Sequence, residues 1–498
     1  MALTLQNSNI NSVFSLRNKT KNYNNAIITV NNNNKPSSQI QIPYIPPEII
    51  NIILFYLKED KKSLAASTNE ISNRTCQIRH FDLSGFSTIG LQKSNATYKN
   101  IINPQCIINI LRFCPNLAAF SISESLESTI TFELLSVLFY ECKDLKMLDF
   151  CGCSSKQFAT NFTKLAESLG KINITNMINN DGDDDQQVQR YYRFEKVPNN
   201  NNQSLLLNHI QRISLHECPS LSEYSTIIPI LAHMPNITHL DLGGCAISDA
   251  TLEFLTYETN ATTSLTDLSL AKCKNISSPA ISSFISQCQE LVTLNLYTDK
   301  AVLASITEYD LITMINSSPS TKKLKSLNIG STNITPRVLY AIQESSSNLK
   351  HLGIAKANIT DVSQLTEFVN SMPLLEYVDF TSIGCLSFLN TNNGFISGLR
   401  KNHPLHTIEM CHNLLKKLRA VEGWKINENY TRRWYYAKDT PNNVRPDRVY
   451  SRKLDITQSG YQKMSKIFQY YAYGQWKISP QFPKIEFQLH GVMCKNIK

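Results

Sequence analysis

The stretch from Ile237 to Leu296 contains the pattern that decides the fold. It reads Ile237-Thr-His-Leu-Asp-Leu242, then Leu265-Thr-Asp-Leu-Ser-Leu270, and then Leu291-Val-Thr-Leu-Asn-Leu296. Apolar side chains occupy the first, fourth and sixth positions of each hexapeptide. Because the fourth and sixth residues lie two apart, a strand places their side chains on one side and the residue between them on the other. The pattern predicts short strands with one apolar face, and we expect the middle residue of each to point into solvent.

The same hexapeptide occurs eleven times along the chain. Its copies begin at Ile78, Leu117, Leu145, Ile210, Ile237, Leu265, Leu291, Leu324, Leu349, Leu375 and Leu405. Steps of 27, 28 and 26 residues separate the four starts from 210 to 291, and a period of this length is the signature of leucine-rich repeats. Between copies, apolar residues at helical spacing, such as Phe132, Leu135 and Phe139, predict a helix. We therefore predict an α/β leucine-rich-repeat solenoid over residues 76–410, curved into a horseshoe because helices are wider than strands.

Cysteines occupy a regular place in four of the repeats. Cys153, Cys218, Cys245 and Cys273 each stand three residues after the last apolar position of the hexapeptide. This placement resembles the cysteine-containing subclass of leucine-rich repeats, which is common in F-box proteins and their relatives. The N-terminus lacks the order of a secretory signal, so we expect the thirteen cysteines to be reduced in a cytoplasmic or nuclear protein. We expect these four to be buried and to bind no metal, because Cys151 and Cys153 have no second pair of cysteines to complete a zinc site.

A short segment before the repeats, Ile45-Pro-Pro-Glu-Ile-Ile-Asn-Ile-Ile-Leu-Phe-Tyr-Leu57, predicts an amphipathic helix. Proline at its start and glutamate in its first turn suit a helix N-terminus. The segment resembles the opening of an F-box, which would occupy residues 41–75. In the F-box family this region docks the Skp1 adaptor, which connects it to a cullin ubiquitin ligase. The resemblance implies Skp1 contacts by Ile45, Pro46, Pro47, Glu48, Ile49, Ile52, Ile53 and Leu57. The alternative is a plain helix that caps the first repeat, because no nearby tryptophan supplies the Val-Cys-x-x-Trp element of typical F-boxes.

Two polar segments flank or interrupt the repeats. Residues 1–40 are Asn-rich and hold no acidic residue, which predicts a disordered tail, with a mitochondrial presequence as the alternative. The starts at Leu145 and Ile210 lie 65 residues apart, about 38 more than one repeat needs. We expect a disordered loop of about residues 171–205 inserted at this repeat boundary.

Residues 411–498 form a basic, aromatic module. They hold seventeen Lys and Arg against six Asp and Glu, a local charge of +11, so residues 1–410 contribute −2 to the net charge of +9. Clusters such as Arg432-Arg-Trp-Tyr-Tyr436 mix cations with aromatic rings. We expect the rings to cover the terminal repeat as a cap, with the charged heads in water. The alternative is that they stack bases and neutralise phosphates of a nucleic acid.

The sequence contains no motif of an active site, a cofactor site or a membrane span. It has no G-x-x-x-x-G-K-[ST], no G-x-S-x-G and no H-E-x-x-H. The acidic run Asp181–Asp185 lacks the spaced ligands of an EF-hand, and no stretch of eighteen apolar residues exists. We therefore predict a non-catalytic protein that needs no cofactor or metal and acts through binding.

The strand face opposite the core is the predicted substrate site. Its polar residues include Arg212, His216, His239, Asp241, Asp267, Asn295, Tyr297, Asn328, His351, Tyr377 and Asp379. By residue type, Arg212, Tyr297 and Tyr377 are the best anchors, and the aspartates favour a basic partner segment. The resemblance implies the substrate-recognition subunit of a Skp1–cullin–F-box ubiquitin ligase. The alternatives are a leucine-rich scaffold or cell-cycle regulator that works without Skp1, and a DNA-repair or chromatin factor that uses the basic C-terminus.

Overall fold

A computed structural model gives the fold of the repeat region. It describes residues 79–83, 103–122, 124–170, 172–178, 190–196, 207–298, 306–388, 394–400, 402–410, 424–427 and 434–438. The predicted tail at residues 1–40 and the F-box-like segment at 41–75 lie outside the described residues, as do the Skp1 contacts expected there.

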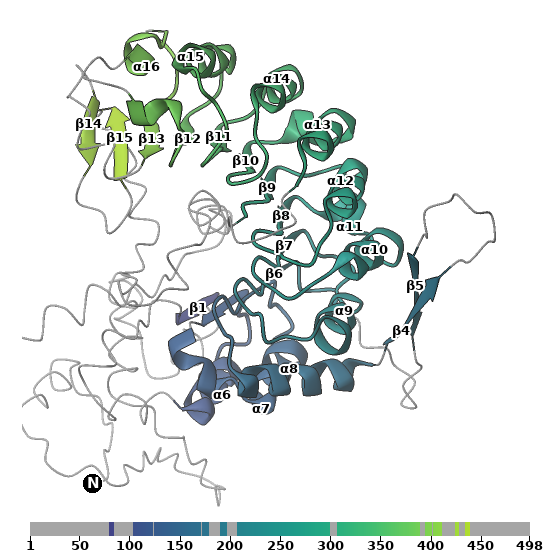
Figure 1. The fold of residues 1–498 in the computed structure, drawn as a ribbon. Helices are drawn as coiled ribbons and strands as arrows, with labels where there is room; N and C mark the ends of the chain where they lie inside the picture. Colours follow the sequence, from purple (N-terminus) through teal and green to yellow (C-terminus); the bar gives the residue numbers. More distant parts are fainter. Residues whose placement is uncertain are drawn as a thin grey trace, which may run out of the picture.

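Eleven parallel strands line one side of the molecule, and each corresponds to one predicted hexapeptide (Figure 1). They are β1 (His80–Leu83), β2 (Ala119–Ile122), β3 (Met147–Asp149), β6 (Arg212–Ser214), β7 (His239–Asp241), β8 (Asp267–Ser269), β9 (Thr293–Asn295), β10 (Ser326–Asn328), β11 (His351–Gly353), β12 (Tyr377–Asp379) and β13 (Thr407–Met410). The strands pair in sequence order, and the central apolar residues stand opposite one another, as Leu240 does with Leu268 and Leu268 with Leu294. The predicted repeat solenoid is confirmed.

Helices return the chain from the end of each strand to the start of the next, and they form the outer layer of the arc (Figure 1). They are α6 (Pro104–Phe113), η3 (Glu124–Thr129), α7 (Phe132–Ser136), η4 (Val137–Glu141), α8 (Lys156–Leu169), η5 (Glu223–Ile227), α9 (Ile228–Leu231), α10 (Asp249–Tyr257), α11 (Ala261–Ser264), α12 (Ser278–Gln287), α13 (Glu308–Ser317), η6 (Thr321–Lys323), α14 (Pro336–Ser345), α15 (Val362–Ser371), η7 (Cys385–Phe388) and α16 (Gly394–Ser397). Most of the longer helices begin after a Ser, Thr, Asn or Asp whose side-chain oxygen accepts a backbone N–H of the first turn. Ser248 does this for Ala250, and Ser277 for Ala280. Within the described part of the chain, no helix is long and apolar enough to cross a membrane.

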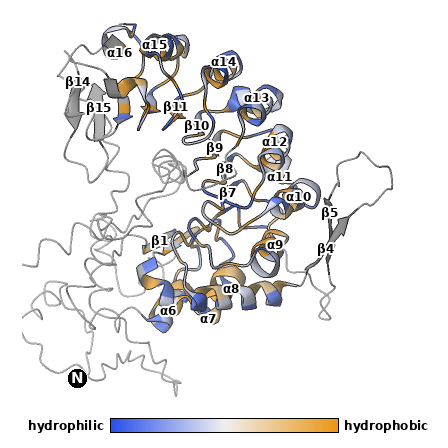
Figure 2. Cartoon of the chain, viewed as in Figure 1, coloured by the Kyte–Doolittle hydropathy of each residue, from blue (hydrophilic) through white to orange (hydrophobic). Residues whose placement is uncertain are grey.

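The hydrophobic core lies between the strands and the helices. The apolar hexapeptide residues of the described strands are buried in it, from Phe81 in β1 to Ile408 in β13. Hydrophobic and hydrophilic stretches alternate along the helices, as expected when one side of each helix packs inward (Figure 2). Of the predicted helix positions, Leu135 and Phe139 are buried, but Phe132 is 37% exposed because it opens the first turn of α7.

The insertion after α8 contains regular structure that the sequence analysis did not predict. Strands β4 (Ile172–Ile178) and β5 (Arg190–Lys196) pair antiparallel over seven residues each, and Phe194 packs 5.1 Å from the ring of Phe254 in α10. The expectation of a wholly disordered loop at 171–205 is therefore corrected. β-branched and aromatic residues are frequent in both strands, and such residues favour a sheet once it can pack on a helix.

The C-terminal end of the sheet is continued by two antiparallel strands. β15 (Trp434–Lys438) pairs with β13, and β14 (Trp424–Asn427) pairs with β15, which makes a sheet of thirteen strands. The segment predicted to cap the solenoid thus supplies backbone partners for the last repeat strand. The residues after Lys438 lie outside the described part.

Candidate functional site: the concave strip

The concave strip is the row of side chains that the strands present on the side opposite the helices. In β7, Leu240 points into the core, so His239 and Asp241 point the other way. Because the strands are in register, equivalent residues stand side by side from β3 to β12. The strip comprises Met147, Asp149, Arg212, Ser214, His216, His239, Asp241, Asp267, Ser269, Thr293, Asn295, Tyr297, Ser326, Asn328, His351, Gly353, Tyr377 and Asp379.

Most polar residues of the concave strip are buried, although they lie outside the hydrophobic core. Asp241 is 4% exposed, Asn295 0% and Asp379 5%. The expectation that the middle residue of each hexapeptide points into solvent is therefore wrong. Parallel strands stand only about 4.8 Å apart, and side chains on the inner side of a curved sheet converge and cover one another.

In five repeats the residue between the last two apolar positions of the hexapeptide has a structural role, because its side chain ends the strand. A carboxylate or amide oxygen accepts the backbone N–H two residues further on, as from Asp241 to Gly243 at 3.0 Å and from Asn328 to Gly330 at 3.1 Å. Asp149, Asn295 and Asp379 form the same turn at 2.9–3.1 Å. In seven repeats the residue three positions after this one has a positive φ, whether or not the side-chain turn is present. These positive-φ residues are Gly152, Glu217, Gly244, Lys272, Ser331, Lys356 and Ser382.

Two imidazole–carboxylate pairs connect adjacent repeats within the strip. His216 Nδ1 lies 2.9 Å from Asp241 Oδ1, and His239 Nε2 lies 2.9 Å from Asp267 Oδ2. Burial alone would raise the pKa of Asp267, but hydrogen bonds from His239 and Thr266 outweigh it and hold that pKa below its ordinary value. Gly243 is required beneath the first pair, because a Cβ there would lie 2.5 Å from His216 Nδ1.

A third connection spans two repeats. Lys272 Nζ lies 2.5 Å from Glu217 Oε1 and reaches it past Gly244 of the repeat between them. A Cβ on Gly244 would stand 3.1 Å from the Glu217 carboxyl, and its φ of 75° also favours glycine. The opposite charges of Glu217 and Lys272, which lie in the turns beside the strip, therefore pair with each other.

The C-terminal part of the strip is also closed by internal contacts. Tyr377 is buried, and its hydroxyl donates a hydrogen bond to the carboxylate of Glu409. The ring of His351 lies 6.4 Å from that of Tyr377, and burial, followed by the positive charges of His406 and Lys350, lowers the pKa of His351 to about 2. Of the three predicted anchors, only Arg212 and Tyr297 remain partly exposed.

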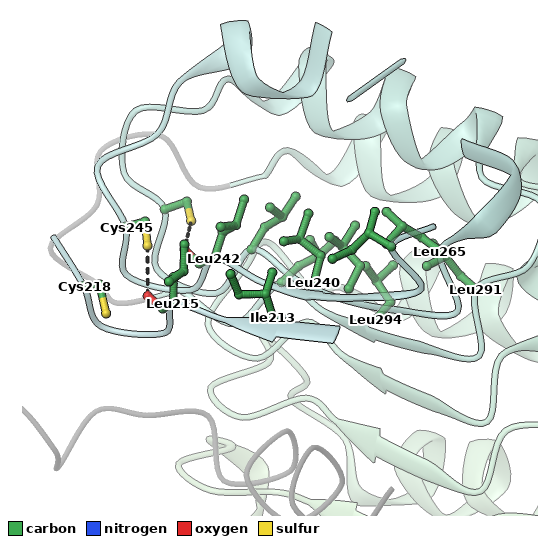
Figure 3. Close-up of a cluster of buried hydrophobic side chains, with 14 of the residues drawn as sticks. Ile213, Leu215, Cys218, Leu240, Leu242, Cys245, Leu265, Leu291 and Leu294 are labelled. Atoms are coloured by element: carbon green, nitrogen blue, oxygen red, sulfur yellow. Dashed lines mark hydrogen bonds between the residues drawn. The ribbon is translucent and has the colours of Figure 1, made fainter. Parts of the chain in front are cut away.

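The repeat cysteines lie on the core side of the turn, where they connect successive repeats. The thiols of Cys218, Cys245 and Cys273 donate to backbone carbonyls of the preceding repeat, at 3.3 Å to Phe150, 3.0 Å to Leu215 and 3.2 Å to Leu242. Figure 3 shows the bond from Cys245 to Leu215. Burial raises the pKa of all three thiols well above the ordinary value. The predicted burial of these cysteines and of Cys153 is confirmed. Within the described residues no cysteine forms a disulfide, and no cluster of His, Cys, Asp and Glu could hold a metal ion.

A further connection between repeats was not predicted. The buried carboxylate of Glu223 accepts hydrogen bonds from the backbone N–H groups of Ser248 at 2.8 Å and Thr251 at 3.1 Å, and from the Thr251 hydroxyl at 2.6 Å. It thereby caps the helix of the next repeat. The signal in the sequence is an acidic residue one repeat length before the Ser or Thr that opens the next helix, as with Glu127 and Ser155.

Comparison with known proteins supports the assignment of the repeats. A family model described as "Leucine Rich repeat" matches residues 233–255. The F-box protein YLR352W of Saccharomyces cerevisiae is 27% identical over 214 residues, which cover 42% of this chain and 23% of that protein. The chain therefore matches less than a quarter of the length of this relative. Together these two findings support an F-box/leucine-rich-repeat protein.

Two solved structures match this chain at low sequence identity and low TM-score. One is the crystal structure of the Rad7 and Elc1 complex in yeast, with a TM-score of 0.39 and 14% identity over 71% of this chain and 92% of that chain. The other is the leucine-rich-repeat-containing protein LegL7 from Legionella pneumophila, with a TM-score of 0.37 and 16% identity over 62% of this chain and 87% of that chain.

Proposed function

We propose that this F-box/leucine-rich-repeat protein is a non-catalytic substrate-recognition subunit of a Skp1–cullin ubiquitin ligase. The observation that carries the proposal is the similarity to an F-box protein together with the repeat solenoid. The solenoid would bind the substrate protein, and the segment from Ile45 to Leu57 would bind Skp1. Ubiquitin transfer would then take place on partner enzymes in the cytoplasm or nucleus.

The contacts of the concave strip fit a binding role better than a catalytic one. The imidazole–carboxylate pairs could in principle move a proton, but His216, Asp241, His239 and Asp267 are all buried. Each pair lies along the sheet and connects one repeat to the next. Such pairs stabilise the solenoid and hold its surface in shape. The substrate would contact the residues around them that remain accessible.

The Skp1 half of the proposal is tested by a double substitution in the N-terminal segment. Burial of a large apolar side chain contributes about 1.5–3 kcal/mol, so Ile53→Asp combined with Leu57→Asp should abolish capture of purified Skp1. The matched control is Ile27→Asp combined with Ile28→Asp in the Asn-rich tail, which should capture Skp1 as the wild type does. Wild-type affinity in the Ile53 and Leu57 variant would show that the F-box assignment is wrong and would leave the solenoid as a scaffold without Skp1.

A further inference from the structure

The aspartates of the concave strip are poorly placed to attract a basic partner. Asp241 already accepts hydrogen bonds from Gly243 N–H and lies against His216, Asp267 lies against His239 and Thr266, and Asp379 accepts the N–H of Thr381. All three are buried. A partner that sought these carboxylates would have to break bonds that hold adjacent repeats together. Charged side chains that contact a partner must therefore lie where they are exposed to solvent.

The amino-terminal rim is such a place, and we define it as the four residues before each strand from β1 to β13. The backbones of its last residues form a continuous ladder. The N–H of Gln211 bonds to the carbonyl of Lys146 at 2.9 Å, that of Lys350 to Lys325 at 2.9 Å, and that of Glu376 to Lys350 at 2.8 Å. The rim residues of successive repeats therefore stand side by side along the edge of the concave strip.

The described part of the amino-terminal rim is basic. It holds seven cations and three carboxylates, a net charge of +4, and five of the cations are lysines that are exposed to solvent. The charged residues are Arg79, Lys143, Lys146, Lys322, Lys323, Lys325, Lys350, Asp144, Glu290 and Glu376. Each carboxylate already pairs with one cation, Asp144 with Arg79 at 3.4 Å, Glu290 with Lys323 at 2.6 Å and Glu376 with Lys350 at 2.6 Å. The five exposed lysines therefore give this edge its positive charge.

The exposed rim lysines fall into two clusters separated by four repeats. Lys143 and Lys146 precede β3, beside the partly exposed Arg212 of β6, and Lys322 and Lys325 precede β10. At the rim, β7 and β8 contribute no charged residue, and β9 contributes only Glu290. Five steps between adjacent strands separate β3 from β10, which corresponds to about 24 Å, or roughly seven residues of an extended chain.

We propose that the amino-terminal rim binds an extended acidic segment of the substrate, with anionic groups at two places about seven residues apart. This inference rests on the proposed adaptor function and gives the substrate its chemical class. Carboxylates of Asp and Glu or phosphate groups on Ser and Thr would provide the shared anionic chemistry. Lysines suit either group, because each ammonium is a compact charge that donates to any oxygen that approaches it.

The test uses full-length protein and three fluorescent peptides with two clusters of three charged residues seven positions apart. One peptide carries Glu in both clusters, the second carries phosphoserine, and the third carries Lys. Fluorescence anisotropy at low salt should show binding of the first two and no binding of the third. Lys143→Glu with Lys146→Glu, and separately Lys322→Glu with Lys325→Glu, should each weaken binding of the acidic peptides by roughly tenfold. The matched control is Lys156→Glu with Lys164→Glu, which changes the same charge on exposed positions of α8 and should leave affinity within about twofold.

Three results would overturn the proposal. The first is equal or tighter binding of the Lys peptide. The second is an equal loss of affinity in the control pair, which would reveal a response to net charge alone. The third is undiminished binding in both rim variants, which would assign the anion affinity to the basic residues 411–498. These measurements contain no Skp1, so a chain that fails to capture Skp1 but binds the acidic peptides at the rim would refute the adaptor function alone.

Discussion

On the helix side of the sheet, Leu240, Leu268 and Leu294 form a column of apolar side chains, whereas Asp241, Ser269 and Asn295 follow them in the same strands and face the concave side. Both sets are buried. The apolar set is stabilised by exclusion from water and by close packing. The polar set depends on partners in adjacent repeats, such as His216 for Asp241 and Asn295 for Ser269. Burial is therefore the same on the two faces, while the interactions that stabilise them differ.

This difference shows where a binding surface can lie on such a solenoid. A polar residue on the concave face is not necessarily free to bind a partner, because its hydrogen-bonding groups can already be bonded to neighbouring residues. Exposed groups at the edges of the strip, such as Lys146 and Lys325, are better candidates for recognition. If the two faces differ in this way, substitutions on the apolar face should cost more stability than those on the polar face. The cost on the polar face should also depend on whether the hydrogen-bond partner is present.

The largest effect is expected in the apolar column. Leu268 is buried in the column between Leu240 and Leu294 of the two adjacent repeats. Leu268→Ala should therefore lower the free energy of unfolding by about 2–5 kcal/mol, through lost burial and a cavity. Urea denaturation followed by far-UV circular dichroism measures the change. Leu374→Ala, at a residue that is 42% exposed, is the control and should change it by less than about 0.5 kcal/mol. Similar costs at the two positions would contradict the assignment of the core.

A smaller loss of stability is expected for the polar set, and its size should depend on the hydrogen-bond partner. Asp241→Ala leaves the Gly243 N–H and the His216 ring without their acceptor, which should cost about 1–3 kcal/mol. A double-mutant cycle with His216→Ala provides the control, because the second substitution should add little once the first has removed the pair. Strict additivity of the two changes would mean that the imidazole and the carboxylate do not stabilise one another.

A pH-dependent effect is expected at His351. Burial lowers its pKa to about 2, while an unfolded histidine titrates near 6.5, so between these values only the unfolded chain gains the proton. The contribution of neutral, buried His351 to the free energy of unfolding is complete above pH 6.5. It is lost as the pH falls, by up to about 1.4 kcal/mol per pH unit. Urea midpoints at pH 7.5, 6.5 and 5.5 should fall less steeply for His351→Gln than for the wild type. Equal slopes would show that the pKa of His351 is the same in the folded and the unfolded chain.

The smallest effect is expected at a cysteine. Cys245→Ala removes a small side chain and one weak hydrogen bond to the carbonyl of Leu215, which should cost about 1 kcal/mol or less. The same thiol should react with a labelling reagent only after denaturation, because it is buried and its pKa is raised. Rapid labelling of Cys218, Cys245 and Cys273 in the native protein would contradict the closed packing of the turns.

The strands were predictable because their apolar spacing is itself the cause of the core. Leu240 and Leu242 must share a side in any strand, and the repeated spacing fixes the register of neighbours. The role of Asp241 was not predictable in the same way, since it depends on His216 of the preceding repeat and on the curvature of the sheet. The hairpin at 172–196 escaped prediction because its packing partner, Phe254, lies sixty residues further along the chain.

The connections between repeats also limit how this array could change in length. From β6 to β8, hydrogen bonds and a helix cap connect each repeat to the one before it, through His216, Glu223, Cys245 and Cys273, and the ion pair of Glu217 with Lys272 spans two repeats. Deletion or duplication of one unit there would bring together residues that do not match, for example His216 against the aspartate of the wrong strand. After β9 the cysteine position holds Thr332, Ala357 and Ile383, and the contacts that replace it are more local, such as Thr332 with Ile329. Other contacts still connect repeats in that half, such as Thr335 with Glu308 and Tyr377 with Glu409, so a change of length there would also have to preserve matching partners.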